Sequence, residues 1–169
     1  MEKNMNITEK IIVRENKVLK LNNVLIRQVR DNEFMDIQKV AYMMESYIKS
    51  KGNSVLGQMI NYSTAEADEN GQVKIVLKLM FQMKDPIHNV ESPYIQESRI
   101  RVKNCLFARY SEKEENLQFA YSKLQLFAFE NDIKLKGEAY TVFVENRDNK
   151  MIADVFMEID KGGLGIESL

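Results

Sequence analysis

The sequence contains no tryptophan, one cysteine, one histidine and two prolines among its 169 residues. A single cysteine excludes a disulfide framework within the chain, and Cys105 with His88 offers too few soft ligands for a zinc or iron-sulfur site. Cys105 alternates with Phe107 on an expected strand, and His88 lies beside Pro86 in an expected loop, so neither belongs to a catalytic motif. We therefore expect no metal centre, no cofactor and no catalytic residue.

Neither sign of charge is in excess, because 24 basic residues face 25 acidic ones and the formal net charge is -1. Without a basic surplus, the counterion release that drives nucleic-acid binding has no evident source, so we do not expect nucleic acid as a partner. No run approaches the ~18 apolar residues of a membrane span, and the first ten residues are too polar for a signal peptide. The sequence predicts a cytoplasmic protein with no membrane partner.

The sequence also lacks an interdomain linker, since no internal stretch is rich in proline, serine or glycine. A chain of this length with 44% apolar residues can bury one sizeable core. We expect residues 1–169 to form a single domain, with residues 1–10 and 161–169 as flexible termini.

Two segments have the apolar spacing of amphipathic helices. The first begins at Asp31 or Asn32, either of which would serve as its N-cap. The second covers residues 112–130, with Ser111 and Glu114 in the spacing of a capping box. Apolar side chains recur at three- and four-residue intervals in both segments, so one face of each helix is expected to be buried.

Strands with alternating apolar residues flank both helices. The expected strands cover residues 24–29, 55–62, 73–83, 100–109, 137–144 and 151–159. Asn70-Gly71 and residues 146–149 mark the tight turns that join the last two strands of each half. The order strand, helix, strand, strand therefore occurs twice, in repeats of approximately residues 18–84 and 97–160.

Short matches between the halves suggest their correspondence. Ala41-Tyr42 falls in the first helix where Ala120-Tyr121 falls in the second, and Gly57 and Gly137 follow at similar distances. Two such units side by side predict an α+β fold, in which one antiparallel-rich sheet carries two long helices on a single face.

Four segments in this order resemble the GyrI-like, or AraC-type effector-binding, domain family over roughly residues 24–159. They are Leu106–Tyr110, Phe119–Tyr121, Leu135–Tyr140 and Ala153–Ile159. The resemblance implies a stand-alone, non-enzymatic bacterial module with a cleft between its two repeats, on the sheet face away from the helices. Family members take small apolar or cationic molecules there, and some bind a protein surface.

The alternation of the last strand identifies side chains for that cleft. If its apolar residues face the helices, two carboxylates and an aromatic ring point the other way. The neighbouring strands add two tyrosines, a lysine and a methionine. The candidate ligand-binding residues are Tyr62, Lys78, Met80, Tyr140, Asp154, Phe156 and Glu158. Alternating polar residues are equally typical of a solvated sheet face with cross-strand ion pairs, so both interpretations stay open.

Some residues depart from the family pattern. Ligand-binding members often have an acid in the closing strand of both halves and some use tryptophan, whereas this chain has Lys74 and Lys78 in its first half and no tryptophan. The hydrolase activity of some relatives needs an acid with aromatic partners, for which Asp154, Glu158 and Tyr140 are the candidates.

Three functions follow from these residues and the resemblance. We expect a binding module with a groove for a small, partly apolar molecule. The alternative is a protein-interaction adaptor or chaperone-like accessory protein, because the chain is also similar to uncharacterised small proteins of Gram-positive bacteria, some of which belong to toxin secretion loci. A small hydrolase is the third. A strand at a sheet edge would allow two copies to pair, so monomer and homodimer both remain open.

Overall fold

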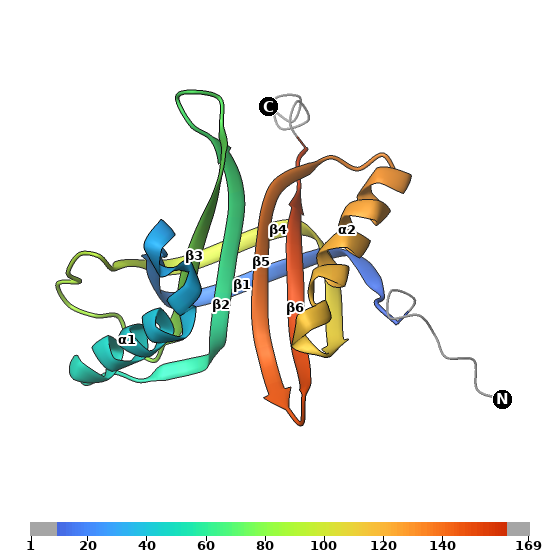
Figure 1. The fold of residues 1–169 in the computed structure, drawn as a ribbon. Coiled ribbons are helices and arrows are strands. Elements are labelled where there is room, and N and C mark those ends of the chain that lie inside the picture. The colour runs from blue at the N-terminus through green and yellow to red at the C-terminus, as the bar shows by residue number, and fades with distance from the viewer. Residues whose placement is uncertain (1–9, 162–169) are drawn as a thin grey trace.

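Six antiparallel strands close into a barrel and two helices pack against its outside in the computed structural model, which describes residues 10–161 (Figure 1). Neighbouring strands follow the order β1-β3-β2-β5-β6-β4 around the barrel. The expected α+β class, with its repeated strand, helix, strand, strand order, is confirmed. Apart from Lys10 and Lys161, the termini expected to be flexible lie outside the described residues.

The elements of the two halves correspond one to one. The first half contains β1 (Val13–Gln28), the 3-10 turn η1 (Asp31–Asp36), α1 (Ile37–Ser50), β2 (Val55–Ala67) and β3 (Val73–Met83). The second half contains β4 (Ile95–Glu112), the 3-10 turn η2 (Glu114–Asn116), α2 (Gln118–Glu130), β5 (Leu135–Arg147) and β6 (Lys150–Ile159). Neither helix combines the length and apolar character that crossing a bilayer requires, within the part of the chain described.

The first helix begins later than its sequence predicts. Asp31 and Asn32 lie in η1, so their expected role as N-cap is wrong, and α1 starts at Ile37. The side chain of Glu33 holds this turn, since its carboxylate accepts the Arg30 backbone N–H at 3.0 Å and Arg27 Nη2 at 2.7 Å. The Arg30 N–H and, less strongly, the guanidinium of Arg27 lower the pKa of Glu33.

The second helix also starts late, and its expected capping box is wrong. Ser111 pairs with Ile152 in the ladder between β4 and β6, so the strand continues where the helix was expected. A short turn, η2, follows before α2 starts at Gln118. Ser111 therefore belongs to strand β4 and does not cap α2, because its pairing in the sheet is more favourable than its preference for a helix N-cap.

Two ladders join the halves. β1 pairs with β4 over most of its length, and β2 pairs with β5 through four residue pairs, from Ile60 opposite Val142 to Ser63 opposite Ala139. The second ladder closes the ring, so each strand has two neighbours where the sequence predicted an open sheet. Register breaks next to Gly57 and Gly137, which have φ of 76° and 94°, bend β2 and β5.

The apolar core is divided among three clusters. One packs α1 against β1 and β3, around Met44, Leu79 and Phe81. A second packs α2 against β4 and β6, around Leu124 and Leu106. The third contains side chains from all six strands and none from a helix, so it fills the barrel interior. Both helices thus lie on one sheet face, the outer one, as the sequence predicts.

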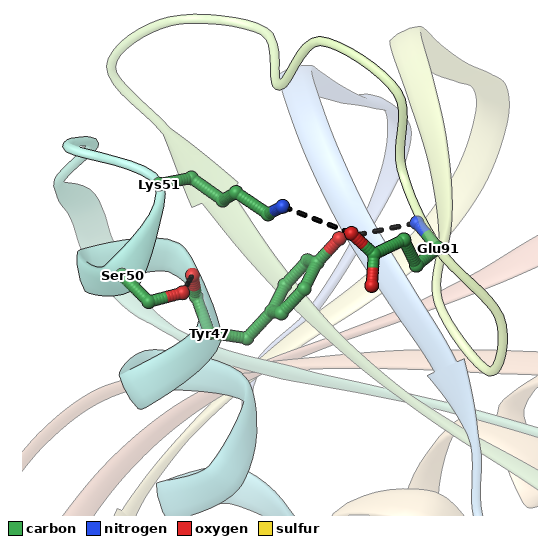
Figure 2. A network of polar contacts seen from close by, with 4 residues as sticks. All are labelled: Tyr47, Ser50, Lys51 and Glu91. Carbon is green, nitrogen blue, oxygen red and sulfur yellow. Dashed lines mark hydrogen bonds and ion pairs between the residues drawn. The ribbon is translucent and has the colours of Figure 1, made fainter.

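Residues 84–94, which connect the two halves, contact the C-terminal end of α1 (Figure 2). The Tyr47 hydroxyl accepts the backbone N–H of Glu91 at 3.1 Å, and Lys51 Nζ lies 3.1 Å from the Glu91 carboxylate. The Tyr47 ring also stacks on Tyr94 with centroids 4.3 Å apart, while Ser50 Oγ donates to the Tyr47 carbonyl at 2.7 Å. These contacts fix the C-terminal turn of a helix whose N-terminal part borders the cavity described next.

Candidate functional site

Four of the seven predicted ligand-binding residues meet inside the barrel. Tyr62, Met80, Tyr140 and Phe156 belong to the same apolar cluster, in which Met80 is 4% and Phe156 9% exposed. The Tyr62 and Tyr140 rings contact edge to face, with centroids 5.0 Å apart. The face on which a groove was expected is therefore largely filled by the protein's own side chains.

The three charged members have partners within the chain. Lys78 Nζ lies 5.4 Å from the centre of the Tyr62 ring. Asp154 accepts two hydrogen bonds from Arg109, at 2.7 Å from Nε and 2.9 Å from Nη2, and Glu158 accepts one from Lys136 at 2.9 Å. Ligand binding by the seven residues stays a prediction.

Burial keeps the ionisable groups of the interior neutral. It raises the pKa of Tyr62 to about 12 and that of Cys105 to about 11, and it also raises the pKa of Tyr140; the nearby carboxylates Glu138 and Glu158 add to these shifts. The two phenols and the thiol are protonated at neutral pH, so none of them acts as a base there.

A cavity of about 410 Å³ lies between the two halves on the helix side of the sheet, and we refer to it as the inter-half cavity. It is lined by Ile37, Gln38, Ala41 and Glu45 of α1, Gly57, Gln58, Met59 and Asn61 of β2, Phe81 of β3, Glu114, and Phe143, Glu145, Asn146 and Met151 of β5 and β6. Sequence reasoning identified none of these residues as a ligand contact.

The polar lining of the inter-half cavity is acidic. Glu45, Glu114 and Glu145 are its ionisable residues, and no lysine, arginine or histidine lines it. Arg147 binds Glu145 at 3.0 Å, whereas no ion pair engages Glu45 or Glu114 within residues 10–161. A ligand entering this cavity would meet two carboxylates that no residue of the described chain neutralises.

Asn61 provides a buried acceptor at this cavity. Its Oδ1 is inaccessible to solvent and has no hydrogen-bond partner within the described chain. Asn61 lies opposite Thr141 in the ladder that joins β2 to β5, the shorter of the two ladders between the halves. Leaving such an acceptor unpaired costs about 1–3 kcal/mol, which a ligand donor would recover once the Asn61 amide turns its oxygen toward the cavity.

A corresponding cavity of about 300 Å³, the counterpart cavity, lies beside α2 and is lined by residues of β2, β3, α2, β5 and β6. Buried positions of α1 recur in α2 after a shift of 80 residues: Val40, Met44 and Ile48 correspond to Ala120, Leu124 and Ala128. The same shift carries Gly57 onto Gly137 and Asn61 onto Thr141. It also carries two residues of the first lining, Ala41 and Glu45, onto Tyr121 and Gln125 of the second.

This register corrects the correspondence inferred from the sequence. Ala41 matches Tyr121 rather than Ala120, and Tyr42 is 71% exposed where Tyr121 packs against the α2 cluster. The Tyr121 hydroxyl forms a hydrogen bond with Thr141 Oγ1. Alanine at position 41 cannot make the matching bond, so the buried Oδ1 of Asn61 is left without a partner at the wall of the inter-half cavity.

No protein-family model matches the chain, and no curated protein matches its sequence. Solved structures do match. A chain of the EcmrR–DNA complex has a TM-score of 0.63 at 12% identity, covering 90% of this chain and 57% of that chain. Two structures described as hydrolases from Listeria innocua have TM-scores of 0.57 and 0.55 at 8% and 9% identity, each covering 89% of this chain and 91% of the other. At these identities the likeness shows the fold alone.

Proposed function

We propose that this chain is a non-enzymatic binding module whose inter-half cavity takes a small, partly apolar molecule carrying a hydrogen-bond donor. The unpaired Oδ1 of Asn61 is the observation that carries the proposal, because the equivalent Thr141 is satisfied by Tyr121. After the Asn61 amide turns toward the cavity, a ligand N–H or O–H would have the role that the Tyr121 hydroxyl has in the other half.

The lining favours a positively charged donor. Glu45 and Glu114 would attract a cation, and the absence of basic side chains from the lining removes any competing partner. Apolar walls, among them Ile37, Phe81 and Met151, would contact the rest of the molecule. An ammonium or amidinium group attached to an aromatic or aliphatic body has this combination of features.

The proposal includes membership of the GyrI-like, or effector-binding, family and a location in the bacterial cytoplasm. The four matching segments and the duplicated fold support the first, and a lone cysteine that forms no disulfide within the chain is compatible with the second. The fold occurs in a chain of a DNA complex and in chains described as hydrolases, so the site rather than the fold must decide the function.

The experiment is a calorimetric titration with phenethylammonium, 2-phenylethanol and 3-phenylpropanoate, which are a cation, a neutral donor and an anion of similar shape. We expect affinity to decrease in that order. Asn61→Leu and Glu45→Gln should each weaken phenethylammonium binding about tenfold. Gln125→Leu, in the counterpart cavity, is the control and should leave binding unchanged.

Two results would oppose the proposal in different ways. No saturable binding of any of the three molecules would remove the small-molecule function for this ligand class. Binding that survives Asn61→Leu and Glu45→Gln but is lost in Lys78→Ala or Tyr140→Phe would keep the function and move the site to the barrel interior.

A protein-interaction adaptor is the second candidate, and one surface favours it. Phe129 is 82% and Leu126 52% exposed on the outer side of α2, where an apolar pair three residues apart is suited to a protein contact. Phe129→Ser would abolish such a contact while leaving phenethylammonium affinity unchanged. A hydrolase has the least support, since Asp154 and Glu158 are ion-paired and Tyr140 is neutral.

A further inference from the structure

A second cavity, of opposite charge, lies at the N-terminal end of β1. This basic cavity has a volume of about 500 Å³ and is lined by Lys10, Ile12, Arg14, Lys17, Phe107, Arg109 and Ser111. Its four ionisable residues are all cations, although the whole chain has a net charge of -1. It shares no residue with the inter-half cavity.

Two of the four cations are already neutralised. Asp154 binds Arg109 through two hydrogen bonds, and Glu112 lies 3.3 Å from Lys10. Arg14 and Lys17 have no carboxylate partner in the described part of the chain, and Lys17 Nζ instead lies 5.4 Å from the centre of the Phe107 ring. The basic cavity therefore keeps two positive charges beside an aromatic side chain.

The backbone is shaped to bring these two cations together. Residues three apart on a regular strand point to opposite faces, so Arg14 and Lys17 would not share a cavity without a bulge. The register of β1 against β4 breaks between Arg14 and Lys17 and again between Lys17 and Leu19, and Asn16 has a φ of 59°. Glu15, the acid within the bulge, does not line the cavity.

We propose that the basic cavity binds a small aromatic anion, with its phosphate or carboxylate held by Arg14 and Lys17 and its ring against Phe107 and Ile12. A guanidinium binds either oxyanion through two parallel hydrogen bonds, and an ammonium adds a point charge. Phe107 is fixed for this role by edge-to-face contact with Phe156, with centroids 5.0 Å apart. Ile12 is 64% exposed, which leaves an apolar surface for the ring.

Titration with phenyl phosphate, benzoate and inorganic phosphate at low ionic strength tests this site. Arg14→Gln with Lys17→Gln should weaken phenyl phosphate binding about tenfold or more. The matched control, Lys39→Gln with Lys49→Gln, removes the same charge from the exposed side of α1 and should change affinity less than about twofold. All four positions are exposed, and thermal melts check that each variant is folded.

The contribution of the ring is measured separately. Ile12→Ser should weaken phenyl phosphate and benzoate but not inorganic phosphate, which has no apolar part. Equal weakening by both charge-removing pairs would mean nonspecific attraction and would overturn the proposal, as would the absence of saturable binding. Loss of phenyl phosphate binding in Asn61→Leu would also overturn it, because the anion would then occupy the inter-half cavity.

Discussion

The two halves of the molecule differ most at one pair of equivalent positions. In the second half Tyr121 reaches Thr141 and satisfies its hydroxyl, whereas in the first half Ala41 leaves the equivalent Asn61 unpaired beside a cavity. The inter-half cavity is also the larger, at about 410 Å³ against 300 Å³. The second half, although it borders a cavity of its own, is therefore closed at this position in the sense that its polar group has a partner, and the first half is open.

The comparison separates what the fold needs from what the site needs. Both halves keep the buried face of the helix and the glycine bulge that bends the following strand, so these features belong to the fold. Only the first half leaves a buried acceptor without a donor at the shared ladder. This unpaired acceptor costs stability and has no equivalent in the other half, which is the difference that the proposed binding site would explain.

Truncating Tyr121 in the second half should have the largest effect, which is on the free energy of unfolding. Tyr121→Ala is expected to lower the free energy of unfolding by about 3 kcal/mol, because it removes a packed ring and leaves Thr141 unpaired. Tyr121→Phe should cost only about 1 kcal/mol, since it removes the hydroxyl alone. Urea denaturation measures both. Equal losses would show that the hydroxyl alone accounts for the stabilisation, whereas no loss in Tyr121→Phe would show that packing of the ring accounts for all of it.

The reciprocal change places a tyrosine at Ala41, the position of the first half that is equivalent to Tyr121. Ala41→Tyr should place a ring in the inter-half cavity and weaken phenethylammonium binding about 100-fold, equivalent to about 2.7 kcal/mol. Ala41→Ser is the control that leaves the space free, and it should bind as the unmodified protein does. Calorimetry measures both, and retained affinity in Ala41→Tyr would mean that the ligand binds elsewhere.

Removing the unpaired acceptor should separate stability from binding. Asn61→Leu is expected to raise the free energy of unfolding by about 1 kcal/mol, because a buried acceptor without a partner is lost, while ligand affinity falls. Thermal and urea unfolding without ligand provide the measurement. A destabilised variant would indicate that Asn61 is already satisfied in solution, for example by an ordered water.

The tyrosines of the barrel interior predict a smaller, pH-dependent effect. The pKa of Tyr62 is raised from 10.0 to about 12, so the folded state favours its protonated form. This contribution is complete below pH 10 and is lost as the pH rises from 10 through 12. Tyr62→Phe should therefore flatten the decline of stability over this range, in urea unfolding at pH 9 to 11.5. An unchanged decline would contradict the burial of this phenol.

The fold was largely predictable because its strands and helices carry strong periodicity. Val73–Met83 has an apolar residue at every second position, and the structure gives β3 those same bounds. The helix starts were not predictable from capping residues, because short 3-10 turns precede both helices and Ser111 pairs within a strand. Closure of the barrel depends on pairing between β2 and β5, which are far apart in sequence and leave no local pattern.

The candidate site was harder to predict than the fold. Alternation placed Phe156 and Met80 correctly on one face, but it did not reveal that closure turns this face inward and fills it. The inter-half cavity exists because Ala41 is small, and a small residue at a helical position carries no signal by itself. An alignment of the halves at a shift of 80 residues, rather than the 79 that pairs Ala41 with Ala120, matches Ala41 with Tyr121 and reveals the difference in size.

The most direct test is to locate a bound ligand by intermolecular nuclear Overhauser effects between phenethylammonium and the methyl groups of the protein. We predict contacts from the ligand ring to Ile37, Met59 and Met151, which line the inter-half cavity, and none to Met80. Contacts to Met80 without any to Ile37 or Met151 would place the ligand inside the barrel and contradict the account.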